Sequence, residues 1–223
     1  GIVGESGSGK STLARVITRL QKPSSGSVSY AGQDIADFSD AELINYHREV
    51  QMAFQNPFDS LNPRSTVRQT IAEPLIVHNL VPRNKVEART SELMKLVELP
   101  ETLGTRRPRQ LSGGQCQRVG IARALAMEPK VLIADEITSA LDVTIQAQIL
   151  DLLERIREQE DLTIIYISHD LAVVRMICSR VAVFREGQLI EIGDVSDVLN
   201  NPTENYTRTL IASAPRFSIE QAS

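Results

Sequence analysis

The sequence predicts an α/β fold built around a parallel sheet, and three observations point to that class. Short apolar segments bounded by turn residues alternate with segments of helical periodicity at both ends of the chain. A glycine-rich loop at 4–11 stands between a strand remnant and an amphipathic helix. The middle of the chain carries helical patterns only, which indicates a helical insertion in an α/β core. We expect one domain over 1–223, with its core at about 1–63 and 128–194, a helical subdomain at about 64–127 and a C-terminal extension at about 195–223.

The N-terminal elements follow from periodicity and from turn residues. Apolar residues within 13–20 recur at i, i+3, i+4 and i+7, which is one face of a helix. The Pro-Ser-Ser-Gly segment at 23–26 ends that helix. Ser39 and Glu42 have the spacing of a capping box and predict a helix that runs to about residue 47. Strands are predicted at 27–30 and 50–55.

The remaining elements continue the alternation. Helices are predicted at 67–78, 85–99 and 113–127. They are followed by a strand at 131–135, a helix that buries apolar positions from Ile145 to Ile156, a strand at 162–167 and a helix at 171–178. The segments 180–185 and 188–192 flank Glu186-Gly187 and predict a hairpin. The tail from about 195 is predicted to be helical and loses its pattern after Pro215.

Composition places the chain among ordinary globular proteins. Hydrophobic residues make up 42% and charged residues 23% of 223 residues, which excludes a wholly disordered or fibrous chain. The net charge is −4, so no basic excess indicates nucleic acid as a partner. Two cysteines, Cys116 and Cys178, form neither a zinc spacing nor a disulfide framework, which favours a reducing compartment. No apolar run approaches the roughly 18 residues that span a bilayer.

The segment from Gly4 to Ser11 predicts a phosphate site. It fits the pattern G-x-x-x-x-G-K-[ST] at every defined position. Glycines allow backbone N–H groups to curl around phosphate oxygens, Lys10 supplies charge to the β- and γ-phosphates, and Ser11 offers a hydroxyl to Mg²⁺. A flexible Gly/Ser turn is the alternative, and the neighbouring strand and helix argue against it. The predicted site residues are Gly4, Glu5, Ser6, Gly7, Ser8, Gly9, Lys10, Ser11 and Thr12.

An apolar strand at 131–134 ends in two carboxylates, Asp135 and Glu136. Ligands of open α/β sheets bind at the carboxyl ends of strands. Asp135 is predicted to hold Mg²⁺, and Glu136 to orient and deprotonate the attacking water. Taken alone, a strand that ends in solvated acids would be the better interpretation; together with the phosphate loop, the catalytic one is favoured.

The segment Leu111-Ser112-Gly113-Gly114-Gln115 precedes a strong helix, and Ser112 and Gln115 have capping-box spacing. Continued to Ala124, it resembles the signature motif of ATP-binding cassette (ABC) ATPases. With the two earlier motifs in the same order, the resemblance covers nearly the whole chain. It implies a P-loop NTPase (RecA-like) core with a helical signature subdomain, and ATP with Mg²⁺ as ligands.

The resemblance also assigns single residues. Gln55 matches the Q-loop glutamine, which reaches Mg²⁺ and the attacking water. His169 resembles the switch histidine that senses the γ-phosphate, whereas His47 and His78 are interpreted as surface or packing residues. Ser139-Ala140-Leu141-Asp142 resembles the D-loop, which passes between subunits. In this family two domains pair head to tail, with ATP held between the phosphate loop of one copy and Ser112, Gly113, Gly114 and Gln115 of the other.

Two further segments narrow the family. The stretches 55–64 and 201–210 resemble those of the peptide/nickel (oligopeptide and dipeptide) importer subfamily. This implies an ATPase subunit at the cytoplasmic face of the inner or plasma membrane, paired with a second copy or a paralogue. It would dock a separate membrane permease through residues around 55–66 and serve, indirectly, a solute-binding protein. No cysteine follows Cys178, so no iron–sulfur cluster is expected.

Several positions depart from the family pattern. Ile137 stands where proline is usual and is expected to leave Glu136 less constrained. Cys116 stands where a longer polar residue is common; it is either a reactive thiol near a helix N-terminus or a small packing residue. Glu204-Asn205 replaces the usual His-Pro. The chain begins at Gly1 with only Ile2 and Val3 before the loop, so we expect a fragment in which the upstream adenine-stacking residue is absent.

Two rival functions stay open at this point. The first is a non-transport ABC ATPase, either of the DNA-repair or chromosome type or an accessory of a cytoplasmic complex such as phosphonate breakdown. The lack of sustained heptads and of basic charge argues against the DNA-associated type. The second is a catalytically weak partner in a heterodimer, which Ile137 favours and the intact Glu136 and His169 oppose.

Overall fold

The computed structural model describes residues 1–213, apart from the side chains of residues 57 and 59. The final residues of the predicted C-terminal extension, 214–223, lie outside the described part. The chain divides into two units, and each is described by itself. One unit joins residues 1–13 to the segment from Tyr166 onward, and the other covers Ala14–Ile165.

The unit of residues 14–165 contains the parallel strand pair β4 (Val50–Ala53) and β5 (Val131–Asp135). Val50 pairs with Val131 and Ala53 with Ala134. Leu132, Ile133 and Ala134 are fully buried, as expected for a continuous apolar strand covered on both faces. Both strands therefore present their carboxyl ends at one edge, where a ligand site of an α/β sheet is expected.

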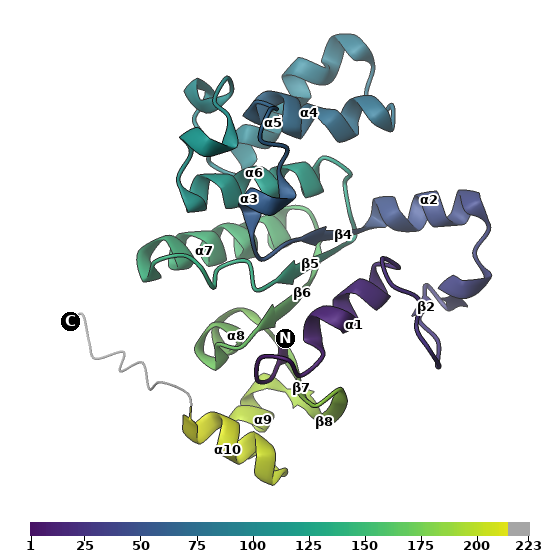
Figure 1. Cartoon of the computed structure of the whole chain (residues 1–223), viewed down its shortest axis with the longest axis vertical. Helices are drawn as coiled ribbons and strands as arrows, with labels where there is room; N and C mark the ends of the chain where they lie inside the picture. The colour runs from purple at the N-terminus through teal and green to yellow at the C-terminus, as the bar shows by residue number, and fades with distance from the viewer. Residues whose placement is uncertain (214–223) are drawn as a thin grey trace. The chain divides into compact units, whose positions relative to one another are not determined.

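The helices that adjoin this strand pair along the chain are labelled in Figure 1. Helix α1 (Lys10–Ile17) enters from the phosphate loop, α2 (Asp40–Glu49) leads into β4, and α7 (Val143–Gln159) follows β5. The predicted capping box of α2 is present: Ser39 Oγ accepts from Glu42 N at 3.4 Å, and Ser39 N donates to Glu42 Oε2 at 2.8 Å. Ile149, Leu152, Leu153 and Ile156 of α7 are buried as predicted, whereas Ile145 in its first turn is only half-buried.

A helical segment lies between the two strands in sequence. It holds α3 (Pro57–Ser60), α4 (Val67–Val77), α5 (Val86–Leu96) and α6 (Gly113–Leu125), with short 3₁₀ turns at 83–85, 101–103 and 108–110. The helix α3 was not predicted, and α5 is shorter at both ends than the predicted 85–99. The other two helices match their predicted positions closely.

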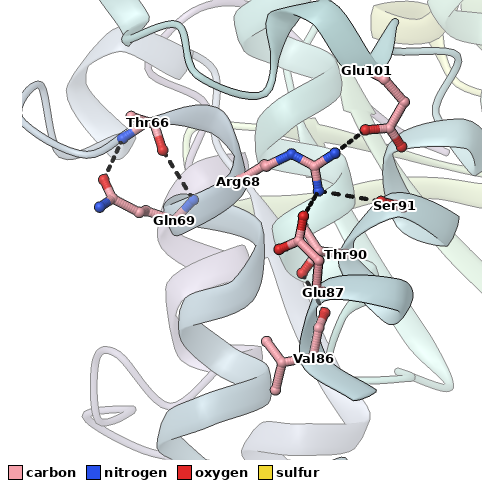
Figure 2. Close-up of polar contacts among 8 residues, drawn as sticks. All are labelled: Thr66, Arg68, Gln69, Val86, Glu87, Thr90, Ser91 and Glu101. Carbon is pink, nitrogen blue, oxygen red and sulfur yellow. Dashed lines mark hydrogen bonds and ion pairs between the residues drawn. The ribbon is translucent and has the colours of Figure 1, made fainter. Parts of the chain in front are cut away.

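Arg68 ties three parts of this helical segment together (Figure 2). Its guanidinium forms ion pairs with Glu87 of α5 and with Glu101, and it donates to Ser91 Oγ at 3.2 Å. Next to it, Thr66 and Gln69 close a reciprocal capping box at the start of α4. The ends of α4 and α5 are therefore fixed by side chains as well as by apolar burial.

The other unit has paired strands of its own. Strand β1 (Ile2–Val3) lies between the end of β6 (Thr163–Ser168) and β7 (Arg180–Arg185), parallel to both. The predicted hairpin is confirmed: β7 pairs antiparallel with β8 (Gln188–Asp194). Helices α8 (Leu171–Ile177), α9 (Val195–Asn200) and α10 (Asn205–Ser213) complete the unit.

The predicted strand at 27–30 is shorter in the structure, and a second short strand that was not predicted pairs with it. β2 (Ser29–Tyr30) and β3 (Gln33–Asp34) form a small antiparallel pair around Ala31 and Gly32, both at positive φ. Within the described part of the chain, no helix has the length and apolar character needed to cross a bilayer.

Candidate functional site

The phosphate loop wraps around the side chain of Lys10. The ammonium group donates to Gly4 O at 2.9 Å, to Glu5 O at 2.8 Å and to Ser8 Oγ at 3.4 Å, and Lys10 is only 4% exposed. A buried cation must be paired or hydrogen-bonded to remain charged, and here the oxygens of the loop itself supply those bonds. The loop therefore holds a fixed positive charge at the first residue of α1.

Close packing against the β7–β8 hairpin explains the first glycine of the loop. A Cβ at Gly4 would lie 2.1 Å from the carbonyl oxygen of Phe184, and its φ of 153° is unusual for other residues. Gly187 N of the hairpin turn donates to Ser8 O at 3.0 Å. The hairpin thus supports the loop from one side and fixes its course.

His169 follows the strand next to the one that feeds the loop. Val3 and Ser168 are paired in register, so Gly4 and His169 are the next residues of two neighbouring parallel strands. His169 is exposed, and Asp170 behind it caps α8 by accepting from Ala172 N at 2.9 Å. Sheet register therefore places the predicted switch histidine at the same edge as the phosphate loop.

In the unit of residues 14–165, the register of two neighbouring parallel strands also brings two predicted residues together, Gln55 and Glu136. Ala53 and Ala134 are paired, and Gln55 and Glu136 each stand two residues further along their chains. Gln55 Nε2 donates to Glu136 Oε2 at 2.9 Å and lies 3.3 Å from Ser139 Oγ. The amide nitrogen is thus directed at the carboxylate, which the sequence analysis had not foreseen.

The backbone at Glu136 has an unusual conformation. Its φ is 48°, in the left-handed region that residues with a side chain rarely adopt. Its carbonyl accepts from Ser139 N at 3.1 Å and from Ser139 Oγ at 2.9 Å, and Ile137 behind it is 1% exposed. Although Ile137 replaces proline, Glu136 is held by a tight turn and by Gln55. Such strained positions concentrate at functional sites. Asp135 is 7% exposed at the end of β5.

The predicted capping box at the start of α6 is confirmed. Ser112 N donates to Gln115 Oε1 at 3.0 Å, and Gln115 N donates to Ser112 Oγ at 3.3 Å. The glycines between them make room for side chains of the same chain. A Cβ at Gly114 would lie 2.5 Å from Ile145 Cγ2, and one at Gly113 would lie 3.2 Å from Leu141 Cδ2. The signature segment is therefore packed against the D-loop and the start of α7.

Two further predicted positions have defined local roles. Asp142 is the N-cap of α7, where its carboxylate accepts from Ile145 N at 3.0 Å. Cys116 is fully buried, and burial raises the pKa of its thiol to about 11. Of the two interpretations of Cys116, the structure supports the packing residue, because burial outweighs any effect of the helix N-terminus.

The predicted residues fall into separate groups. One group consists of the phosphate loop, which follows β1 and includes Ser11, and His169, which follows β6. Both belong to the unit of residues 1–13 and 166 onward. Gln55 and Glu136 meet at the β4 and β5 edge, beside Asp135. The third group is the signature segment, where the side chains of Ser112 and Gln115 each accept a hydrogen bond from the backbone N–H of the other residue.

Sequence reasoning missed two residues beside the phosphate loop. Tyr206 of α10 lies with its hydroxyl 3.5 Å from Glu5 N, and the Arg185 guanidinium stands 5.0 Å from the Tyr206 ring centroid. No local pattern could have revealed a contact between residues so far apart in the chain. The only available signal was the resemblance of the tail at 201–210 to the importer subfamily.

Comparison with known proteins identifies the family of the chain. The family model described as ABC transporter matches residues 1–139. The chain is 46% identical, over 96% of its length, to the oligopeptide transport ATP-binding proteins AppF of Bacillus subtilis (strain 168) and OppF of Escherichia coli (strain K12). It spans 66% and 65% of their lengths, which is slightly less than two thirds.

Solved structures show the same fold. The dimeric post-hydrolysis structure of the ATP-binding cassette MJ0796, bound to ADP and Pi, superposes with a TM-score of 0.77 at 34% identity and covers 87% of this chain and 84% of its own. The structure of cbiO1 from Clostridium perfringens, part of the ABC transporter complex cbiONQ, gives a TM-score of 0.80 at 33% identity and covers 90% and 78%. The α/β fold predicted as a P-loop NTPase core is confirmed, and the chain belongs to the ABC transporter family.

Proposed function

We propose that this chain is the ATP-hydrolysing, nucleotide-binding part of an importer for peptides or similar solutes. The observation that carries the proposal is the hydrogen bond from Gln55 to Glu136, which holds a carboxylate at the edge of a parallel strand pair. A phosphate loop with a buried lysine supplies the complementary binding group. Together they are the parts that phosphoryl transfer to water requires.

Nucleotide binding begins with the phosphate loop. Residues Gly4 to Thr12 surround the β- and γ-phosphates, with Lys10 as the charge and the start of α1 as a source of N–H donors. Mg²⁺ prefers hard oxygen ligands, so Ser11, Gln55 and Asp135 are the residues that would hold it. Their hydroxyl, amide and carboxylate oxygens fit that ion chemically, and Asp135 is largely buried at a strand end. When bound, the ion neutralises charge on the phosphates.

Hydrolysis is assigned to Glu136. Its carboxylate accepts from the Gln55 amide through one oxygen, which orients the group toward the edge of the strand pair. We assign it to orient the attacking water and take its proton, with His169 as the residue that responds to the γ-phosphate. The two hydrogen bonds from Ser139 to the Glu136 carbonyl hold the backbone at this residue, where φ is positive, and the Gln55 amide holds its carboxylate.

A second copy or a paralogue is proposed to complete the site. The solved MJ0796 cassette, bound to ADP and Pi, is dimeric. Ser112, the N-cap of helix α6, is exposed, and a helix N-terminus favours an anion. In a head-to-tail pair, the segment 112–115 and Asp142 of one copy would face the triphosphate held by the other. The segment 64–127 would then act as the helical subdomain that carries the signature.

An apolar groove supports the proposal of a membrane permease as partner. A cavity of about 550 Å³ lies on the 14–165 unit and opens to solvent. Its walls include large exposed apolar residues, with Leu20 and Ile44 63% exposed and Val77 65% exposed. Such a patch on a surface marks a protein interaction site. Among the described residues, none of the expected docking segment 55–66 lines this groove, but Phe54, directly before the Q-loop glutamine, does, so a permease helix seated here would lie next to the start of that segment.

The solute class follows from the relatives. Two of them are described as oligopeptide transport ATP-binding proteins. We propose peptides or similar solutes for this chain too, delivered by a solute-binding protein, with the chain at the cytoplasmic face of the membrane. The relatives give no support to a non-transport ABC ATPase.

One experiment tests the whole proposal. The complete protein is co-expressed with permease genes of the oligopeptide-transport type from the same organism and purified through a tag on a permease subunit, and ATP hydrolysis is measured in proteoliposomes. The proposal predicts co-purification, Mg²⁺-dependent hydrolysis and faster turnover when a peptide-loaded binding protein is added. Hydrolysis without any association with a permease would favour the non-transport alternative.

A further inference from the structure

The C-terminal segment that follows β8 is fastened by a single carboxylate. Glu191 of β8 accepts from Thr203 N and Thr203 Oγ1, both at 2.9 Å, and from Glu204 N at 3.3 Å. Burial raises the pKa of Glu191, and the hydrogen bonds that it accepts lower that pKa by more, so the net direction is downward. Three donors on one ionised carboxylate hold the chain where it turns into α10.

Arg208 closes the same turn from the other side. Its guanidinium donates to Pro202 O at 3.1 Å, to Thr203 O at 3.1 Å and to Asn205 Oδ1 at 2.9 Å. Glu204 and Asn205, which depart from the subfamily pattern, thus both make contacts here. Glu191 therefore fixes the start of α10 to the hairpin. A helix as short as α10 would be marginally stable alone, and these contacts stabilise it.

This anchoring places Tyr206 beside the phosphate loop. Tyr206 is the second residue of α10, and its hydroxyl oxygen accepts from Glu5 N at 3.5 Å. Its ring lies under the Arg185 guanidinium at 5.0 Å. Arg185 ends β7, directly after Phe184, whose carbonyl packs against Gly4. The hairpin and α10 thus meet at the first turn of the loop.

We propose that Tyr206 is a positioning residue of the phosphate loop, set by the Glu191-anchored start of α10 and acting through the N–H group of Glu5. The inference rests on the proposed nucleotide binding and adds to it that Tyr206, 201 residues from Glu5 in the chain, holds the loop in its binding shape. The peptide group that carries the Glu5 N–H also carries the Gly4 carbonyl, which accepts from Lys10 Nζ at 2.9 Å, and the next peptide group carries the Glu5 carbonyl, which accepts from Lys10 Nζ at 2.8 Å. Fixing Glu5 therefore fixes one of the oxygens that orient the lysine.

The physical effect is a lower ordering cost on nucleotide binding. A glycine-rich loop without side supports must lose conformational freedom when it closes on phosphates. The bond to Tyr206 is long, at 3.5 Å, and its contribution falls within the ordinary range for one hydrogen bond. Loss of the hydroxyl should therefore raise the Kd and the KM for ATP by about two- to tenfold and leave kcat unchanged.

The test is Tyr206→Phe in the complete protein, with Tyr30→Phe as the matched control. Tyr30 also uses its hydroxyl in a hydrogen bond, to Glu49 at 2.7 Å, but lies in the other unit. We expect Tyr206→Phe to raise the Kd and KM for ATP, to keep kcat, and to speed hydrogen exchange at the Glu5 amide, whereas Tyr30→Phe changes none of these. A lower kcat with unchanged KM would indicate a merely structural role and overturn the proposal, as would unchanged values throughout.

A double-mutant cycle tests the anchoring. Glu191→Gln alone should raise the Kd for ATP in the same direction, and Glu191→Gln combined with Tyr206→Phe should give no further rise, because both act through the same contact. If the two effects on the Kd for ATP are additive, Glu191 does not act through Tyr206. If the wild-type protein binds no ATP, the proposed function itself fails. If the wild type binds ATP and Tyr206→Phe binds it equally well, only the positioning role fails.

Discussion

Gln55 Nε2 donates a 2.9 Å hydrogen bond to Glu136 Oε2, and the two residues stand at equal distance beyond a paired Ala53 and Ala134. Register in a parallel pair thus decides which side chains meet at the ligand edge. Because the amide nitrogen points at the carboxylate, the amide oxygen points elsewhere. The same glutamine can therefore hold the proposed base and serve as a ligand for Mg²⁺.

Glu136→Gln should lower kcat for ATP hydrolysis by about 10²- to 10⁴-fold, the usual contribution of a positioned general base. The Kd for ATP should stay within about threefold of wild type, because the phosphate loop is unchanged. Steady-state kinetics and calorimetry measure the two quantities. Glu160→Gln, at an exposed glutamate on the last turn after α7, is the control and should behave as wild type. Full turnover in Glu136→Gln would remove the assigned base.

Lys10→Ala should weaken ATP binding at least about tenfold, because it removes a charge-assisted partner of the phosphates. The variant also takes away the cation that the carbonyls of Gly4 and Glu5 surround, so the loop loses its internal support. Calorimetric titration with ATP reports the change. Lys22→Ala, at an exposed position, is the matched control. Unchanged affinity in Lys10→Ala would contradict the phosphate site.

Cys116 should resist thiol reagents in the folded protein. Burial raises its pKa to about 11, so at pH 8 only about one thiol in a thousand is ionised, and the group is also shielded. The Cys178→Ser variant, which keeps Cys116 alone, should therefore label only after unfolding. The Cys116→Ala variant keeps the half-buried Cys178 and should label in the native state. Rapid native labelling of Cys116 would restore the reactive-thiol interpretation.

Glu98→Gln should lower the free energy of unfolding at pH 7 by about 1 kcal/mol, a modest value because the carboxylate is half exposed. Ion pairing with Arg155 and with Arg118, the latter at 2.8 Å, lowers the pKa of Glu98. A lowered carboxyl pKa stabilises the fold above the unfolded-state value and loses that effect as the pH falls through the folded-state value.

The difference between wild type and Glu98→Gln should therefore be full at pH 7 and shrink below about pH 4.5. Denaturant unfolding at several pH values measures it. Glu92→Gln removes an exposed i,i+3 partner of Arg89 and should change stability by less than about 0.5 kcal/mol. A difference for Glu98→Gln that persists unchanged at pH 3 would show that the ion pairs are not its cause.

Local signals in the sequence were enough for most of the fold. The capping boxes at Ser39 and Ser112, the β7–β8 hairpin and the buried side of α7 follow from spacing and periodicity, which act over a few residues. The short strand β3 and the helix α3 were missed, because elements of two to four residues carry too little pattern to be separated from turns.

The sequence predicts which residues form the candidate site, but it does not predict the contacts between them. Motif spacing identified Gln55 and Glu136, but the direction of the Gln55 amide depends on strand pairing between distant segments. The left-handed backbone at Glu136 had no signal in the sequence. Cys116 could not be decided locally, because the helix N-terminus and burial shift a thiol pKa in opposite directions and tertiary packing determines which dominates.

ATP is proposed to bridge two copies, and the mass of the Glu136→Gln protein in solution tests that bridging directly. With saturating Mg²⁺ and ATP, light scattering should give twice the monomer mass, and the monomer should return with ADP or when Ser112→Arg is added. If calorimetry shows ATP bound to Glu136→Gln while the mass stays that of a monomer, also after addition of a paralogous ATPase subunit from the same organism, the proposed binding of one triphosphate by two copies is wrong.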